Sequence, residues 1–278
     1  MGEPNQFGNA GPFTASLSTY CTGSVWIADA ITAFTVFSVS RIVMITVNDD
    51  GDVRIVTFDR PEQRNAITSD GLEALEAAVT DCPASVVYLR GTGDSFCAGA
   101  DLSSVAALAD GGDAEAFIRR GQRTADAIER SDAIVVAGID GAARGGGVEL
   151  ALACDVRIAT QAATFGEPGV TFGLFGAWGG TVRLPEVVGL GDALDVSLSG
   201  RVLDSAEALR IGLVSRIVEE PRRVADQIAE NDRHALGHVK QRIRDRAEKS
   251  VQENAEARAF EALIETHAEK LRELGNDR

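Results

Sequence analysis

The sequence predicts an α/β fold, on three observations. Short apolar runs rich in Val and Ile alternate with segments of helical spacing, and glycine-rich turns join several of these pairs. A densely charged segment with helical character follows Pro221. At 278 residues, with 45% hydrophobic and 25% charged residues, the chain is long enough for one large core and an appendage.

The expected elements follow one another along the chain. Residues 44–58 are predicted to form a hairpin around an acidic turn at Gly51. Ser69 is expected to cap the first helix and Asp204 a later one, because both are side chains that accept a backbone N–H. The remaining predictions are helices over 69–79, 114–130, 205–211 and 222–274, and strands over 53–58, 86–89, 133–139, 156–160 and 213–218.

Residues 1–43 differ from the rest. Only Glu3 and Asp29 are charged in the first forty residues, and nothing basic precedes the apolar run over 25–39, which argues against a secretory signal. Asp29 and several Ser and Thr interrupt that run, which weakens a membrane span. We therefore expect an extension at 1–43 with the native start at Met44, a core over 44–220 and a helical region over 221–278.

The most informative segment runs from Gly141 to Asp155. Three successive glycines, 145–147, lie where an extended segment leads into a helix. Backbone N–H groups there can approach a ligand, and the start of a helix adds partial positive charge. Glu149 falls in the first turn of that helix, so its carboxylate would face whatever the amides polarise. A tight packing turn is the plainer interpretation of the glycines alone.

A second loop strengthens the functional interpretation. The segment Phe96–Asp101 is a small-residue loop that follows a buried strand over 86–89 and opens another helix. Two strand–loop–helix units would then present backbone amides from different loops. Acyl-transfer and enolate chemistry uses this arrangement, because negative charge on a thioester oxygen is held best by two converging donors.

Four motifs in order make the chain resemble the crotonase, or enoyl-CoA hydratase/isomerase, family. The motifs are FDRPEQRNAI at 58–67, FCAGAD at 96–101, GGGVELALACD at 145–155 and SAEALRIGLV at 205–214, within a similarity that runs from about Val53 to Val218. The resemblance implies a spiral of strand–strand–helix units, an acyl-CoA substrate with no separate cofactor, and a helical C-terminal region that makes trimer contacts in a homotrimer or hexamer.

The resemblance also implies roles for single residues. The N–H groups of Ala100 and Gly146 would form the oxyanion hole, and Glu149 would be a catalytic glutamate. Ala98, Gly99 and Asp101 would lie along coenzyme A. Because coenzyme A is an anion, Arg60 and Arg64 are candidates to meet its charge; a solvated loop is the alternative for both.

One position departs from the family pattern. Where the hydratases read Phe-Gly-x-Pro-Glu, this chain has Gly169 in place of the second glutamate. Glu167 is two residues away, roughly 6–7 Å in an extended chain and on the same face. We expect Glu167 to be a solvated surface residue, since entry into the site would need a displaced loop. Phe175 or Trp178 is expected to fill the space left at Gly169.

The composition of the chain, and the motifs that it lacks, argue against other kinds of active site and partner. The only histidines, His234, His238 and His267, lie far along the chain from the glycine loops, which argues against a Ser-His-Asp triad or a zinc centre. No Gly-Lys pair exists for a phosphate-binding P-loop. The net charge of −15 argues against nucleic acid and anionic membrane as partners. Scarce lysine with excess acid fits a high-salt cytoplasm.

The dispersed cysteines fit a reducing, cytoplasmic setting. Cys21, Cys82, Cys97 and Cys154 form no Cys-x-x-Cys pair. Cys97 is expected to be a packing residue, because no histidine or lysine lies nearby to lower its pKa.

The sequence therefore favours an enzyme that acts on an unsaturated acyl-CoA thioester. Hydration asks for a base on the water and an acid at the α-carbon, whereas moving a double bond needs one carboxyl, so the choice between the two reactions stays open. An acyl-CoA-binding protein on the same fold without chemistry is the alternative. A purely structural protein would leave both glycine-rich loops unexplained, and the acyl-chain specificity cannot be read from the sequence.

Overall fold

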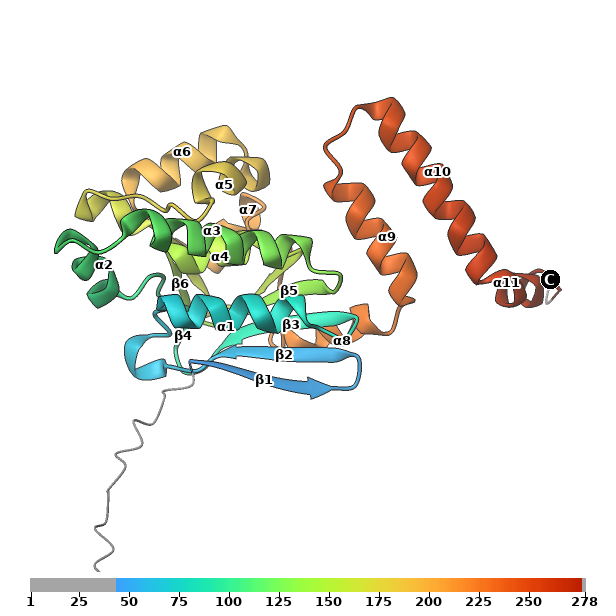
Figure 1. Cartoon of the computed structure of the whole chain (residues 1–278), viewed down its shortest axis with the longest axis horizontal. Helices are drawn as coiled ribbons and strands as arrows, with labels where there is room; N and C mark the ends of the chain where they lie inside the picture. Colours follow the sequence, from blue (N-terminus) through green and yellow to red (C-terminus); the bar gives the residue numbers. More distant parts are fainter. Residues whose placement is uncertain (1–43, 277–278) are drawn as a thin grey trace, which may run out of the picture. The chain divides into compact units, whose positions relative to one another are not determined.

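Ten strands form two sheets in the computed structural model, which describes residues 44–276 (Figure 1). The predicted extension over 1–43 lies outside the described residues. The larger sheet has the order β1-β2-β3-β5-β7-β10, and the smaller one β4-β6-β8-β9. Strands of the larger sheet are β1 (Ile45–Asp50), β2 (Val53–Phe58), β3 (Val86–Gly91), β5 (Ile134–Ile139), β7 (Val156–Ala159) and β10 (Arg216–Ile217). Strands of the smaller sheet are β4 (Ser95–Cys97), β6 (Ala142–Arg144), β8 (Thr164–Gly166) and β9 (Val202–Asp204).

From β3 to β8, consecutive strands alternate between the two sheets. The pairs β3–β4, β5–β6 and β7–β8 each send the first strand into the larger sheet and the second into the smaller one, and all neighbours among them are parallel. Helices follow each pair, so the chain advances as a spiral of strand–strand–helix units, as predicted. Only β1–β2 and β8–β9 are antiparallel within the described residues, and β1–β2 is the predicted hairpin.

The central strands β3 and β5 of the larger sheet are buried on both faces, and their side chains alternate between two apolar clusters. Val87, Leu89 and Val135 belong to the main core, which also holds apolar side chains of the smaller sheet and of α1, α3 and α4. Val86 and Val136, their neighbours along the strands, point into a second cluster with Val224 of α8. A strand buried on both faces appears in sequence as a continuous apolar run, which is the pattern seen here.

Eleven helices lie between residues 44 and 276. They are α1 (Ser69–Thr80), α2 (Leu102–Ala109), α3 (Ala114–Arg130), α4 (Gly146–Ala153), α5 (Gly180–Val188), α6 (Leu190–Ser199), α7 (Ser205–Arg210), α8 (Arg222–Ala229), α9 (Arg233–Arg244), α10 (Lys249–Thr266) and α11 (Ala268–Asn276), with short 3-10 turns η1 (Pro61–Gln63) and η2 (Pro168–Phe172). Asp204 caps α7 as predicted, with its side chain accepting from Glu207 N at 2.8 Å. The prediction for α1 was wrong by one residue: Thr68, not Ser69, is the N-cap, and accepts from Gly71 N.

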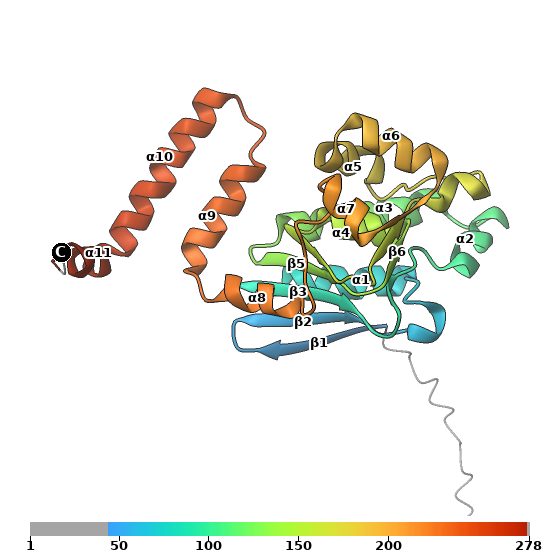
Figure 2. The same ribbon diagram turned by 180° about the vertical axis from the view of Figure 1, so that it is seen from behind.

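The C-terminal region is helical as predicted but consists of four separate helices. Figure 2 shows α9 and α10 side by side beyond α8. Lys240 of α9 ties this pair to the core, because its ammonium group lies 2.8 Å from Asp155 and donates to Ala133 O. The predicted strand over 213–218 contracts to the two residues of β10. No helix between residues 44 and 276 combines the length and the apolar character needed to span a membrane.

Candidate active site

Two loops meet at the start of α4. Gly99 has φ +91°, and a Cβ there would lie 2.7 Å from the carbonyl oxygen of Arg144 and 3.0 Å from Gly146 N. A Cβ on Gly147 would overlap the carbonyl oxygen of Cys97. These glycines therefore let the loop after β4 and the first turn of α4 approach within backbone contact, which a larger residue on either side would prevent.

The meeting point holds two amides that the secondary structure does not use. Ala100 forms a parallel bridge with Ile67, whose bonds run from Ile67 N to Gly99 O and from Asp101 N to Ile67 O. The N–H of Ala100 lies between these two bonds and takes part in neither. Gly146 is the first residue of α4, and the first amides of a helix have no partner inside it. The two amides predicted for the oxyanion hole are thus brought to neighbouring positions, at a helix start that favours negative charge.

Glu149 lies in the first turn of α4, as predicted, and is only 2% exposed. Its Oε1 accepts two backbone hydrogen bonds, from Trp178 N at 2.8 Å and from Gly180 N at 2.7 Å. Burial raises the pKa of Glu149, while the amides of Gly180 and Trp178 and the charge of Arg183 act to lower it. The carboxyl group is therefore fixed in position and favours the proton more than a solvated glutamate does.

The turn over Glu149 must be made of glycine. A Cβ on Gly176 would lie 2.8 Å from the Glu149 carboxyl carbon, and one on Gly180 would lie 2.8 Å from Oε1. Between them, the buried Trp178 ring packs against the α-carbon of Gly146, so that any side chain at 146 would overlap it. The same residue thus supplies an amide to the carboxyl group and a wall beside the Gly146 amide.

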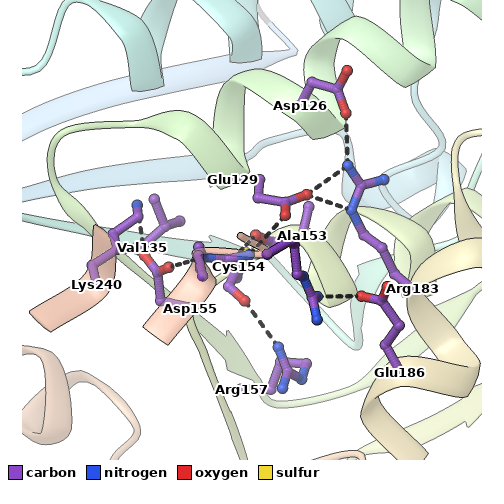
Figure 3. Close-up of polar contacts among 12 residues, drawn as sticks. Asp126, Glu129, Val135, Ala153, Cys154, Asp155, Arg157, Arg183, Glu186 and Lys240 are labelled. Atoms are coloured by element: carbon purple, nitrogen blue, oxygen red, sulfur yellow. Dashed lines mark hydrogen bonds and ion pairs between the residues drawn. The ribbon is translucent and has the colours of Figure 1, made fainter. Parts of the chain in front are cut away.

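Arg183 anchors the helix that carries this turn. From α5 it reaches Asp126 at 2.7 Å and Glu129 at 2.8 Å, both on α3, as Figure 3 shows. Arg244 of α9 binds the other oxygen of Glu129 at 3.1 Å and also Asp155 at 2.9 Å. The network connects α3, α5 and α9, and it holds the first residues of α5 against the carboxyl group of Glu149.

Asp101 is committed to its own loop. Its carboxylate caps α2 through Ser103 N and Ser104 N and forms an ion pair with Arg60 at 2.7 Å. The hydrogen bonds from Ser103, Ser104 and Arg60 lower the pKa of Asp101 to about 2. Arg60 therefore stabilises this loop through its ion pair with Asp101, and its role toward coenzyme A stays a prediction.

Arg64 has a different environment from Arg60. It is exposed, adopts φ 52°, and its carbonyl accepts from Ala98 N at 2.9 Å, so its side chain starts beside the loop predicted for coenzyme A. Sequence reasoning overlooked its neighbour Asn65, which is fully buried with φ 58°. Asn65 accepts from Arg60 N and donates to Thr92 O and Ser95 O, thereby fixing the approach to β4. Its place in the motif FDRPEQRNAI was the only available signal.

Glu167 overturns the prediction of a solvated residue. It is 7% exposed, and its Oε1 has no hydrogen-bond partner within residues 44–276. The chain does not continue as a strand after β8, because Pro168 begins the 3-10 turn η2. Glu167 and Gly169 consequently do not share a strand face, and the carboxyl group turns inward.

The space at Gly169 is filled by backbone. A Cβ at Gly169 would lie 2.9 Å from the α-carbon of Phe175 and 3.0 Å from Leu174 O. Phe175 thus occupies this position, as one of the two expectations stated, while Trp178 lies instead against Gly146.

The remaining sequence predictions concern cysteine and metal chemistry. Cys97 is fully buried, and burial raises the pKa of its thiol to about 12, which confirms a packing residue. His234 and His238 lie on α9, and His267 pairs with Asp232 at 3.2 Å. The described residues contain no group of three or more His, Cys, Asp or Glu side chains placed to hold a metal ion.

Comparison with known proteins places this chain in a family. The family model described as enoyl-CoA hydratase/isomerase matches residues 49–275. A probable enoyl-CoA hydratase of Rhizobium meliloti is 34% identical over 81% of this chain and 91% of its own length. A short-chain-enoyl-CoA hydratase of Clostridium acetobutylicum is 34% identical over 72% of this chain and 80% of its own.

Solved structures agree with the sequence comparisons. An enoyl-CoA hydratase of Bacillus anthracis is 31% identical with a TM-score of 0.77, covering 84% of this chain and 97% of its own. A structure from Thermobifida fusca, described as a putative enoyl-CoA hydratase in complex with acetoacetyl-CoA, is 27% identical with a TM-score of 0.74 over 80% and 95%. The chain belongs to the crotonase, or enoyl-CoA hydratase/isomerase, family and is an enzyme of that family.

Proposed function

We propose that this enzyme acts on unsaturated acyl-CoA thioesters, with the N–H groups of Ala100 and Gly146 as the oxyanion hole and Glu149 as the acid–base group. One observation carries the proposal: a buried, fixed carboxyl group lies on the same first helical turn as an unused amide, beside a second unused amide from another loop. Donors aimed at a developing enolate oxygen stabilise the transition state more than the ground state.

The chemistry follows from these positions. Two hydrogen bonds to the thioester oxygen stabilise negative charge on it. The β-carbon of a 2-enoyl thioester then accepts a nucleophile more easily, and the γ-carbon of a 2-enoyl or the α-carbon of a 3-enoyl thioester releases a proton more easily. Glu149 then moves the proton. Its raised pKa suits this task, because an acid–base group works best when its pKa approaches the working pH.

Coenzyme A would lie along the loop of Ala98 and Gly99. Support comes from the close approach of this loop to Arg144 and Gly146 and from the exposed Arg64 beside it. The Thermobifida fusca relative described with acetoacetyl-CoA supports the same substrate class. No cofactor apart from the coenzyme A of the substrate enters this proposal.

We also propose that the chain assembles as a homotrimer or a hexamer through its C-terminal helices. Several large apolar side chains of α9, α10 and α11 are exposed in the single chain, among them Ile243, Phe260 and Leu274. Removing apolar area of this kind from water favours association. Sedimentation of the purified protein would measure the assembly directly.

The second candidate function is binding of acyl-CoA without turnover, which Gly169 favours because the second glutamate of the hydratases is absent there. The test is incubation of the purified protein with crotonyl-CoA and longer 2-enoyl-CoA and 3-enoyl-CoA thioesters. Mass spectrometry detects added water, and chromatography detects a moved double bond, which leaves the mass unchanged. Tight binding by calorimetry with neither product would support the second candidate, and no binding would contradict both.

A further inference from the structure

Glu167 is a buried carboxyl group for which the proposed function gives no role. It lines a cavity of about 30 Å³ together with Gly176, Gly180, Thr181 and Ser197, and with the apolar side chains of Val170, Phe175 and Leu184. A cavity of this size has room for a water molecule. Burying a carboxyl group with an unpartnered oxygen is costly, so its retention calls for an explanation.

The cavity adjoins the carboxyl group of Glu149. Gly176 and Gly180 line the cavity, and the same two residues are in contact with Glu149, whose Oε1 accepts from Gly180 N. The backbone also joins the two sites, because Gly145 N, at the start of α4, donates to Gly166 O at 2.9 Å. Glu167 and Glu149 therefore approach one narrow turn of chain from two elements, β8 and α4.

No cation balances Glu167 within the described residues. The elements packed around it carry acidic residues, namely Glu149 on α4, Glu186 on α5, Asp192 and Asp195 on α6 and Asp204 on β9, and three arginines whose partners lie elsewhere. These are Arg144 on β6, which donates to Thr164 and to Ala143 O, Arg183 on α5, which binds Asp126 and Glu129, and Arg201 beside β9, which binds Asp195 and Glu207. Burial, together with the charge of Glu149, raises the pKa of Glu167 to about 8.

We propose that Glu167 is the second acid–base carboxyl group of this active site, supplied from a position two residues before the glycine that departs from the hydratase pattern. This inference rests on the proposed function. It assigns hydration to the enzyme as well as isomerisation, because the two carboxyl groups divide the tasks that one alone would have to combine.

Hydration gives each carboxyl group one proton transfer. Glu149 enters as the carboxylate and takes a proton from water while the oxygen bonds to the β-carbon. The electron pair of the double bond moves to the α-carbon and the thioester oxygen, and the Glu167 carboxylic acid donates its proton to the α-carbon. Glu149 is then protonated and Glu167 ionised, and transfer of one proton from the first to the second restores the starting state. The net change is addition of one water.

The assignment gives hydration a defined pH dependence. Glu167 must be protonated, so hydration falls as the pH rises through about 8. Stability responds in the same range: the folded-state pKa lies above the ordinary value of 4.5, so unfolding releases protons, and the free energy of unfolding declines as pH rises from 4.5 to 8. Above pH 8 this contribution is constant.

The experiment compares Glu167→Gln with wild type and with Glu219→Gln, an exposed control. Hydration of crotonyl-CoA and isomerisation of 3-hexenoyl-CoA are measured from pH 5 to 9, together with crotonyl-CoA affinity by calorimetry. We expect Glu167→Gln to lower hydration by roughly 10²–10⁴-fold with unchanged affinity, the usual contribution of an acid–base group. Isomerisation, which uses Glu149, should persist. Melting temperature should decline from pH 5 to 8 more steeply in wild type than in Glu167→Gln.

The outcomes separate the two proposals. Wild type without turnover of either thioester would contradict the proposed function and this inference together. Wild type that isomerises but does not hydrate, or a Glu167→Gln variant that hydrates at the wild-type rate, would overturn the role of Glu167 alone. Equal pH dependence of the melting temperature in wild type and Glu167→Gln would also overturn it, since the buried group would then not carry a proton at neutral pH.

Discussion

Two glycine-rich turns beside α4 use their backbone amides differently. In the turn that precedes α5, the N–H groups of Trp178 and Gly180 both bind Glu149. In the loop after β4 and at the first residue of α4, the amides of Ala100 and Gly146 remain outside the local pairing. The first turn thus fixes a catalytic candidate in the protein, and the second presents donors to a ligand. Both regions need glycine. In the first turn a side chain would overlap Glu149, and in the second a side chain would keep the loop after β4 from contacting the start of α4.

The largest expected effect comes from replacing the ionisable carboxyl group that the first turn holds. Glu149→Gln keeps an oxygen for the amides of Trp178 and Gly180 but cannot carry the proton. We expect turnover of enoyl-CoA to fall by roughly 10²–10⁴-fold with little change in substrate affinity. Steady-state kinetics and calorimetry measure the two quantities, with Glu219→Gln as the exposed control. Wild-type turnover in Glu149→Gln would remove this residue from the mechanism.

The second prediction removes a donor from the other turn. Ala100→Pro deletes the N–H proposed to bind the thioester oxygen, and loss of one such donor costs about 10²–10³-fold in rate. Ala100→Gly keeps the N–H and serves as the matched control, and circular dichroism establishes that both variants fold. A folded Ala100→Pro variant with full activity would exclude this half of the oxyanion hole.

The third prediction tests the packing of the first turn. Restoring the glutamate of the hydratase pattern, Gly169→Glu, places a Cβ 2.9 Å from the α-carbon of Phe175, which is backbone and cannot rotate away. We expect a loss of about 1–3 kcal/mol in the free energy of unfolding and no gain in hydration.

A matched control for Gly169→Glu is Gly191→Glu, because a Cβ there meets open space. Urea denaturation compares the two variants. An equally stable Gly169→Glu variant with faster hydration would show that the turn accommodates the side chain and that Gly169 limits hydration.

The smallest effect is expected at the anchor of α5. Arg183 lowers the pKa of Glu149 by its charge, so Arg183→Gln should raise that pKa further. If the rate depends on the carboxylate form, the acidic limb of the pH–rate profile moves to higher pH. The control is Arg246→Gln, which breaks an exposed ion pair of 2.7 Å with Glu186. Glu186 lies on α5, as Arg183 does. Identical acidic limbs in wild type and Arg183→Gln would contradict the coupling.

Local patterns were sufficient for the larger sheet but not for the smaller one. The alternation of apolar runs with helical segments located the six strands of the larger sheet and missed the short strands β4, β6, β8 and β9 and the helices α5 and α6. The three glycines at 145–147 placed Glu149 in the first turn of α4. The cap at Asp204 was also found, because capping depends on a side chain and an amide three residues away. Such features are decided by neighbours in the chain.

The failures concern residues whose environment comes from distant segments. Glu167 was expected in solvent, but the turn at Pro168 and the cover of α5 and α6 bury it. The ion pair between Arg60 and Asp101, 41 residues away, was not predicted either. In both cases the sequence shows the charged residue but not the segments that surround it after folding.

The sequence by itself determined the α/β class through its periodicity and the position of Glu149 through its glycines. It also determined the family through four ordered motifs, and the resemblance to that family implied the spiral. Only the tertiary structure decided which amides hold Glu149, what fills the space beside Gly169 and that Glu167 shares the interior with Glu149. The physical reason is that burial and electrostatic coupling arise between elements that meet only after folding, and a buried carboxyl group carries the same letter in the sequence as an exposed one.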